Sequence, residues 1–154
     1  MSDDETSRFT ASCWKAEEAA LRLIARAEQS SLGLTAKLVR KGFSADEVRT
    51  VVSSLLDRNL INNERYAELW VRSRLSQGKS PNWLFSSLLK RGIDRKSALS
   101  ALEKVLDPET EHELLLKFVE KAGISGHAGE IFPRKRLKSE GFSSNALDAY
   151  YCIL

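Results

Sequence analysis

The chain repeats itself three times around a glycine. Gly42, Gly92 and Gly141 lie in closely similar surroundings, at spacings of 50 and 49 residues. A leucine precedes each glycine by four residues, and an apolar residue follows each by six. The leucines are Leu38, Leu88 and Leu137, and the later apolar residues are Val48, Ala98 and Leu147. A period near 50 residues predicts a fold built from copies of one supersecondary unit.

The residues next to each glycine predict a tight turn between two helices. Glycine is favoured just past a helix C-terminus, where the backbone is left-handed. An apolar residue and then a helix-capping residue follow, which is the pattern of a staple and an N-cap. The three turns read Gly42-Phe43-Ser44, Gly92-Ile93-Asp94 and Gly141-Phe142-Ser143. The helix before each turn is expected to begin near Ser30, Ser80 and Gly129, and Pro133 then falls inside the third of these helices.

A longer helix is expected before each hairpin, because apolar residues recur there at helical spacing. One begins at the Asn62/Asn63 caps, and another follows Asp107-Pro108, a cap with proline at the first helical position. No segment alternates as a strand would. The sequence therefore predicts an all-α fold of nine helices in three tandem three-helix, helix-turn-helix-like repeats. The expected divisions are an acidic N-terminal tail (1–12) and repeats at 13–60, 61–106 and 107–154.

Composition narrows the class of protein. The 154 residues include 2 Cys, too few for a disulfide framework, so Cys13 and Cys152 are expected to be buried thiols. No stretch approaches the ~20 apolar residues of a membrane span. The acidic start, Met1-Ser2-Asp3-Asp4-Glu5, is unlike a secretory signal. The expectation is a soluble cytoplasmic protein with no membrane partner.

The motifs of catalysis are missing or incomplete. Gly78-Lys79-Ser80 looks like the end of a phosphate-binding loop, but Ser73 stands where that motif needs glycine, and a helix is expected before it instead of a strand. His112 and His127 have no neighbouring Cys or His at metal-ligand spacing and are expected on the surface. We therefore expect no enzyme activity, no catalytic residues, no metal and no cofactor.

Charge is the most informative remaining signal. The net charge of +3 hides a central segment, residues 21–106, with 16 basic and 8 acidic residues between acidic flanks. Such asymmetry suggests a polyanion or an acidic protein surface as partner. Each cation alone is as well explained by solvation or by the helix dipole, but their recurrence favours a shared role in binding. The candidates are Arg22, Arg26, Lys37, Arg40, Lys41, Arg72, Arg74, Lys90, Arg91, Arg134, Lys135, Arg136 and Lys138.

An ordered set of short motifs resembles the RecX family of recombination regulators over about residues 16–106, and more weakly beyond. The motifs are Ala20-Leu21-Arg22-Leu23-Ile24-Ala25-Arg26, Leu38-Val39-Arg40-Lys41-Gly42-Phe43, Leu60-Ile61-Asn62-Asn63-Glu64-Arg65-Tyr66-Ala67, Trp70-Val71-Arg72-Ser73-Arg74-Leu75 and Lys90-Arg91-Gly92-Ile93.

The resemblance implies an elongated, curved array of repeats that acts as a monomer. It implies binding to the RecA recombinase filament on single-stranded DNA and inhibition of its ATPase and recombination activity, with consequences for DNA repair and the SOS response. Direct contact with the DNA would be weak and salt-dependent. No catalytic residues carry over from the family.

Two other functions stay open at this stage. One is a direct DNA-binding helix-turn-helix module with a transcriptional or architectural role. The helix expected at 44–59 presents mainly Asp46, Glu47, Arg49, Ser53 and Asp57, a poor set for reading base edges. The other is a scaffold that binds a different acidic protein.

Overall fold

All three glycines have the left-handed backbone that the repeat predicts. In this computed structural model, which describes residues 2–123 and 132–153, the φ angles are 97° at Gly42, 78° at Gly92 and 94° at Gly141. The leucine four residues before each glycine is fully buried, at Leu38, Leu88 and Leu137. Equivalent positions in the three repeats therefore play equivalent parts in the core.

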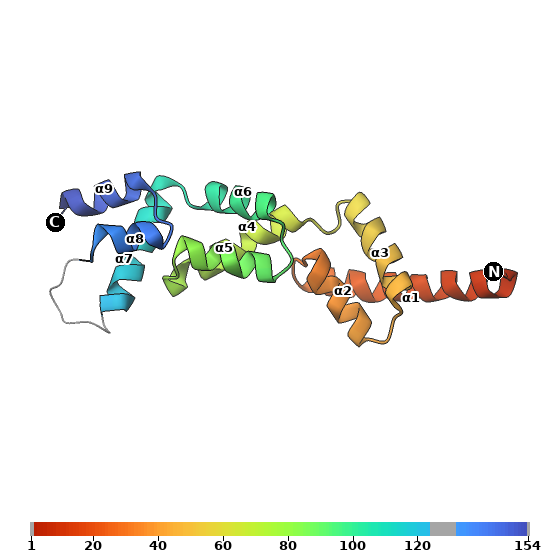
Figure 1. Cartoon of the computed structure of the whole chain (residues 1–154). Helices are drawn as coiled ribbons and strands as arrows, with labels where there is room; N and C mark the ends of the chain where they lie inside the picture. Colours follow the sequence, from red (N-terminus) through yellow and green to blue (C-terminus); the bar gives the residue numbers. More distant parts are fainter. Residues whose placement is uncertain (1, 124–131, 154) are drawn as a thin grey trace. The chain divides into compact units, whose positions relative to one another are not determined.

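The described residues form nine α-helices and one 3-10 turn, with no strand among them, and the predicted all-α repeat fold is confirmed. Figure 1 shows their order along the chain. The helices are α1 (Asp3–Arg26), α2 (Ser31–Arg40), α3 (Ala45–Asp57), α4 (Asn63–Arg74), η1 (Leu75–Gln77), α5 (Pro81–Lys90), α6 (Arg95–Val105), α7 (Pro108–Gly123), α8 (Arg134–Ser139) and α9 (Ser144–Ile153).

The predicted caps set the helix ends. Ser30 and Ser44 accept hydrogen bonds from the backbone N–H of Gly33 and Glu47, and Asp94 accepts one from Ser97. Ser80 accepts from the N–H of Trp83 at 3.3 Å. These bonds satisfy donors that the first turn of a helix leaves unpaired. Gly129, the cap expected for the third repeat, lies outside the described residues, as do His127 and Leu154.

The structure differs from the sequence expectation at the N-terminus, at Pro133 and at the two cysteines. Residues 3–12, expected as an acidic tail, form the first turns of α1, because Ser2 and Glu5 make a capping box. Pro133 is the N-cap of α8 and not inside it, which suits a residue that has no N–H to donate. Cys152 is exposed and Cys13 half-buried, since Cys152 lies off the buried stripe of Ala146, Leu147 and Tyr150 on α9.

The chain divides into two compact units, which we describe separately. Unit 1 comprises Met1–Tyr66 with Arg91–Ile93, and unit 2 comprises Ala67–Lys90 with Asp94–Leu154. The predicted limits of the three repeats, 13–60, 61–106 and 107–154, stay a prediction.

Unit 1 is a three-helix bundle in which α1, α2 and α3 pack on one another. Its core includes Ala16, Ala20, Leu34, Leu55 and Ile61. At its edge, Asn63 of α4 accepts a hydrogen bond from the N–H of Ser31 at 2.9 Å and donates one to the Ser31 hydroxyl. This pair ties the start of α2 to the start of α4.

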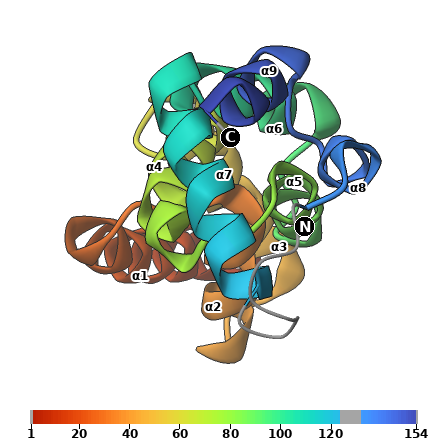
Figure 2. The same cartoon turned by 90° about the vertical axis from the view of Figure 1, so that its left-hand side faces the viewer.

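In unit 2, α5 packs on α6, and α9 packs on α7 and α8 (Figure 2). The buried Glu111 of α7 accepts hydrogen bonds from both the N–H and the hydroxyl of Ser143 at 2.7 Å, which anchors the start of α9. Asn82 of α5 donates to the carbonyls of Ser139 and Glu140. The second and third predicted repeats are thus joined by direct hydrogen bonds.

The capping carboxylates make stability depend on acid pH. Hydrogen bonds from the Ser97 hydroxyl and N–H lower the pKa of Asp94, and bonds from the Thr110 N–H and hydroxyl lower that of Asp107. Because the unfolded chain binds these protons more readily, stability is full above the unfolded pKa and falls as the pH drops through the folded pKa. We expect the urea midpoint to fall below about pH 4.

The check is urea unfolding at a series of pH values between about 7 and 3. Asp94→Asn retains a capping amide that does not titrate in this range, so it should lose less of its midpoint on acidification than the original chain. An acid profile identical for the two proteins would contradict a contribution from Asp94.

Candidate functional site

Paired cations recur at the end of the second helix in the first two repeats. Arg40 ends α2 and Lys41 is its C-cap, whereas Lys90 ends α5 and Arg91 follows it. All four side chains are exposed. The carbonyl end of a helix favours a positive charge, so local electrostatics accounts for part of the pattern. Ser139 and Glu140 hold these positions at the end of α8, so the pair does not extend to the third repeat.

The other predicted cations of unit 1 differ in how they are held. Arg22 forms an ion pair with Glu18 one turn earlier on α1, at 2.7 Å between Nη2 and Oε1. Lys37 is half-buried and donates to the Gln29 side chain at 2.7 Å. Arg26, in the last turn of α1, is exposed. Lys37 therefore has a structural partner, while Arg26 presents its charge to solvent.

The cations of α4 lie beside an aromatic side chain and a cap. The Arg74 guanidinium lies 5.4 Å from the centroid of the Trp70 ring. Arg72 is exposed, and its charge adds a smaller effect to the Thr110 hydrogen bonds that lower the pKa of Asp107. Arg74 thus lies beside an aromatic ring, and the charge of Arg72 interacts favourably with the capping carboxylate of Asp107.

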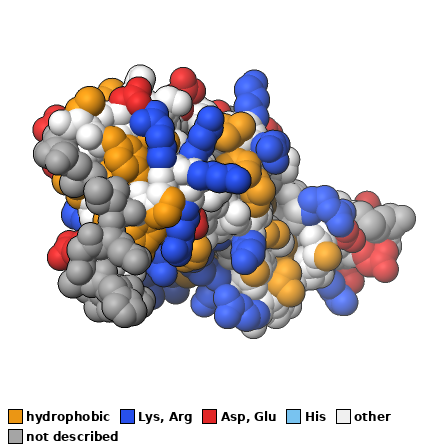
Figure 3. Space-filling view, turned by 60° about the vertical axis from the view of Figure 1, so that its left-hand side comes forward, with side chains coloured by type: hydrophobic (Ala, Val, Ile, Leu, Met, Phe, Trp, Pro, Cys, Tyr) orange, Lys and Arg blue, Asp and Glu red, His pale blue; other side chains and the backbone are white. Residues whose placement is uncertain are grey.

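Four predicted cations crowd α8. Arg134 forms an ion pair with Asp148 of α9 and lies 5.8 Å from the Tyr151 ring centroid. Arg136 lies 5.0 Å from the Phe132 ring centroid. Lys135 and Lys138 are exposed. Figure 3 shows Lys and Arg side chains interspersed with hydrophobic ones on the face turned towards the viewer.

Of the thirteen predicted cations, Lys37 and Arg74 are half-buried and the other eleven are exposed. Side-chain contacts described above hold Arg22, Lys37, Arg74, Arg134 and Arg136. The thirteen cations lie on or next to α1, α2, α4, α5 and α8. Their role as a partner-binding surface stays a prediction.

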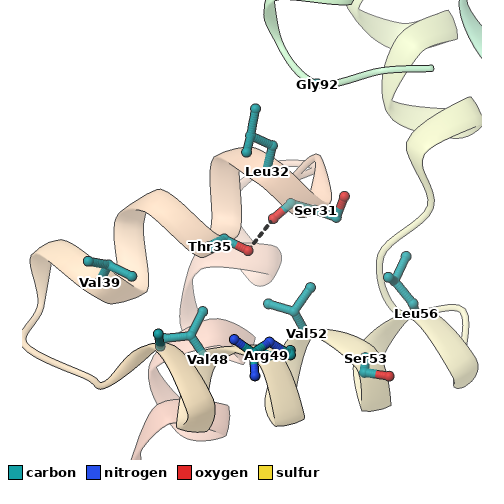
Figure 4. A pocket seen from close by; sticks show the side chains of 11 residues that line it. Ser31, Leu32, Thr35, Val39, Val48, Arg49, Val52, Ser53, Leu56 and Gly92 are labelled. Atoms are coloured by element: carbon teal, nitrogen blue, oxygen red, sulfur yellow. Dashed lines mark hydrogen bonds between the residues drawn. The ribbon is translucent and has the colours of Figure 1, made fainter. Parts of the chain in front are cut away.

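Each of the first two repeats has a groove between its second and third helices. In repeat one it measures about 550 Å³ and is lined by apolar side chains of α2 and α3, including Leu32, Val39 and Val52, with Gly92 at one end (Figure 4). The equivalent groove in unit 2 measures about 410 Å³ and is lined by residues 50 positions later, such as Asn82 and Leu102, and by Gly141. The second groove also holds Arg95, Glu103 and Glu111, so the two differ in chemistry.

The sequence prediction missed two residues of unit 2, Lys79 and Trp83, which contact each other. The Lys79 ammonium lies 5.2 Å from the centroid of the Trp83 ring, and Trp83 stacks on Trp70. A signal was present, because Lys79 precedes Trp83 by four residues, two residues before α5 begins. It was hidden because Lys79 belongs to the segment that looks like a phosphate-binding loop.

The described residues show neither a metal cluster nor a membrane-spanning helix. They contain no group of three or more His, Cys, Asp or Glu side chains that could hold a metal ion. Nor does any described helix have the length and apolarity needed to cross a membrane. His112, expected on the surface, is half-buried on α7.

Fold and surface together define the class of protein: an all-helical chain of tandem three-helix repeats with exposed cations. A family model described as the first three-helix domain of RecX matches residues 16–55, and the model of the second three-helix domain matches residues 62–102. The glycine turns at Gly42 and Gly92 both lie inside these matches.

Relatives extend the match over most of the chain. Regulatory protein RecX of Treponema pallidum (strain Nichols) is 32% identical over 127 residues, which cover 82% of this chain and 77% of that protein. Regulatory protein RecX of Amycolatopsis mediterranei is 34% identical over 125 residues, covering 80% and 71%. The crystal structure of RecX from Lactobacillus salivarius shares the fold, with a TM-score of 0.72 at 24% identity over 94% of this chain and 97% of that one. The chain belongs to the RecX family of regulatory proteins.

Proposed function

We propose that this chain binds the RecA recombinase filament on single-stranded DNA and lowers its ATPase and recombination activity. The observation that carries the proposal is membership of the RecX regulatory family combined with exposed cations at the same place in two successive repeats, Arg40-Lys41 and Lys90-Arg91. The regulator would act in the cytoplasm as a monomer and without enzymatic activity of its own, modulating DNA repair and the SOS response.

Physical reasoning supports a filament as the partner. Linked binding modules gain avidity when the target offers repeated sites at a matching spacing. Repeat proteins of this kind suit extended targets for the same reason. Exposed Lys and Arg side chains can contact acidic side chains, DNA phosphates or both, and the phosphate contacts would weaken as salt rises.

A RecA ATPase assay on single-stranded DNA tests the proposal. We expect this protein, at amounts below one copy per RecA, to slow DNA-dependent ATP hydrolysis, and the effect to weaken between about 50 and about 200 mM salt. The protein with DNA and ATP but no RecA should hydrolyse nothing. Unchanged RecA hydrolysis throughout the salt series would overturn the proposal.

A further inference from the structure

Two tryptophans of unit 2 form a stacked pair with one ring partly open to solvent. Trp70 of α4 and Trp83 of α5 have ring centroids 6.1 Å apart and planes inclined by 19°. Trp70 is only 7% exposed, whereas Trp83 is 40% exposed. The buried ring therefore supports the exposed one and fixes its orientation, which lowers the entropic cost of stacking a further planar group there.

Each ring of the pair carries a cation. Lys79 lies 5.2 Å from the Trp83 centroid, and Arg74 lies 5.4 Å from the Trp70 centroid. Lys79 is exposed two residues before the start of α5, so its ammonium can reach a ligand that approaches Trp83. An aromatic surface bordered by positive charge is the combination that binds single-stranded nucleic acids, since bases stack and phosphates pair with cations.

A hollow of about 430 Å³ adjoins the exposed ring. Trp83, Lys79 and Phe118 line it, together with polar groups that include Asn82 and Glu140. The aromatic side chains offer apolar surface to a planar ligand, and the amide and carboxylate can bond to its edge. Glu140 disfavours a phosphate inside the hollow, which favours an orientation with the base inside and the phosphate outside near Lys79.

Comparison between repeats shows that the fold does not require the tryptophan pair. The positions equivalent to Trp70 and Trp83 in the first repeat are Ala20 and Gly33, and that repeat packs into the same helical hairpin. In the third repeat, Phe132 stands at the position of Trp83 and has Arg136 5.0 Å from its ring centroid. An aromatic ring with a cation beside it therefore occurs at this position in both the second and the third repeat.

Phe118 links the two aromatic groups. It lines the hollow beside Trp83, and its own ring centroid lies 6.3 Å from that of Phe132. The aromatic side chains thus continue from the stacked pair to α8 without leaving unit 2.

We propose that Trp83, Lys79 and Phe118 form a stacking site for a nucleobase of a single-stranded nucleic acid. As a DNA contact it deepens the proposed function, which places the protein on a filament that contains single-stranded DNA. The site selects single strands, because the faces of bases inside a duplex are already stacked. None of the three side chains is assigned to the sugar, so the same chemistry would accept deoxyribose or ribose strands.

Binding of fluorescently labelled oligonucleotides to the full chain tests the site. The probes are a thymidine strand, a uridine strand, a DNA duplex and an abasic strand that keeps the phosphates but lacks bases. We expect the thymidine strand to bind more tightly than the abasic strand or the duplex and to quench tryptophan fluorescence. Tighter binding of either base-containing strand than of the abasic strand supports the site, and the ratio of the two affinities tells whether DNA or RNA is preferred.

Trp83→Leu should weaken binding of the thymidine strand about tenfold and leave the abasic strand unaffected. Trp14→Leu is the matched control, because Trp14 is 71% exposed on α1 and belongs to unit 1. It should bind as the original chain does. Equal binding of the thymidine strand by Trp83→Leu and the original chain would overturn the proposal, as would an equal loss for the abasic strand.

Two further measurements allow the stacking site to be tested even if Trp83→Leu does not fold, and separately from the effect on RecA. Lys79→Ala leaves both tryptophans in place and should weaken the thymidine and abasic strands alike, since Lys79 is assigned to the phosphate. If Trp83→Leu does not fold, absence of base-dependent fluorescence quenching in the original chain overturns the proposal. Base-dependent binding without any effect on RecA hydrolysis would contradict only the proposed function, and RecA inhibition without base-dependent binding only this site.

Discussion

Gly92→Ala should destabilise the protein by about 3 kcal/mol, whereas Gly42→Ala should cost about 1 kcal/mol. Both glycines have left-handed backbone, so both substitutions carry the conformational cost of a Cβ there. At Gly92 the new Cβ would also lie 2.7 Å from Cβ of Leu32 on α2. The Leu32 Cβ is fixed by its backbone, so relief requires α2 to shift. At Gly42 nothing lies within 4 Å of the added atom.

Urea unfolding of the two variants measures the difference, with Gly42→Ala as the matched control for backbone cost. Gly141→Ala gives a second instance, because its Cβ would collide with the Asn82 side chain and lie 3.2 Å from the Asn82 backbone nitrogen. We expect Gly141→Ala to resemble Gly92→Ala. Equal losses of stability at all three glycines would show that the close contact with the second helix of the preceding repeat contributes nothing.

This contrast marks what local sequence can predict. The left-handed glycines, the caps at Ser44 and Asp94 and the proline at the start of α5 follow from backbone chemistry within a few residues. The close approach of Gly92 to Leu32 joins residues 60 positions apart. No local rule gives that distance, although Asn82 and Gly141 repeat the same contact about 50 positions later.

The candidate site divides in the same way. Exposure of Arg40, Lys41 and Lys90 follows from their place at helix ends, and the sequence predicted it. The aromatic partners of Arg74 and Arg136 depend on side-chain direction, so the sequence alone could not separate them from solvated cations. Trp83 was not predicted, because helical periodicity indicates which face of a helix is buried but does not identify a ring at the edge of that face.

Reversal of the recurrent cations should separate binding from folding. Arg40→Glu, Lys41→Glu and Lys90→Glu together should raise the concentration needed for half-maximal inhibition of RecA hydrolysis about tenfold or more, because each change replaces attraction to an acidic surface or phosphate by repulsion. The three side chains are exposed, so the substitutions should leave the helical content unchanged. They should lower the stability only slightly, through the loss of favourable charge at the helix ends. The measurement is the RecA ATPase titration at low salt, with circular dichroism of each variant.

The matched control changes net charge by the same amount at positions on α1 and α3 that lie away from the helix-end cations. Arg8→Glu, Lys15→Glu and Arg49→Glu are exposed substitutions outside the predicted set, and the structure pairs Arg8 with Asp4 and Arg49 with Asp46. If inhibition depends on where the cations lie, this control should retain most of its potency. Equal losses of inhibition in the two triple variants would mean that net charge alone governs the inhibition of RecA. The helix-end cations would then have no specific role in the interface.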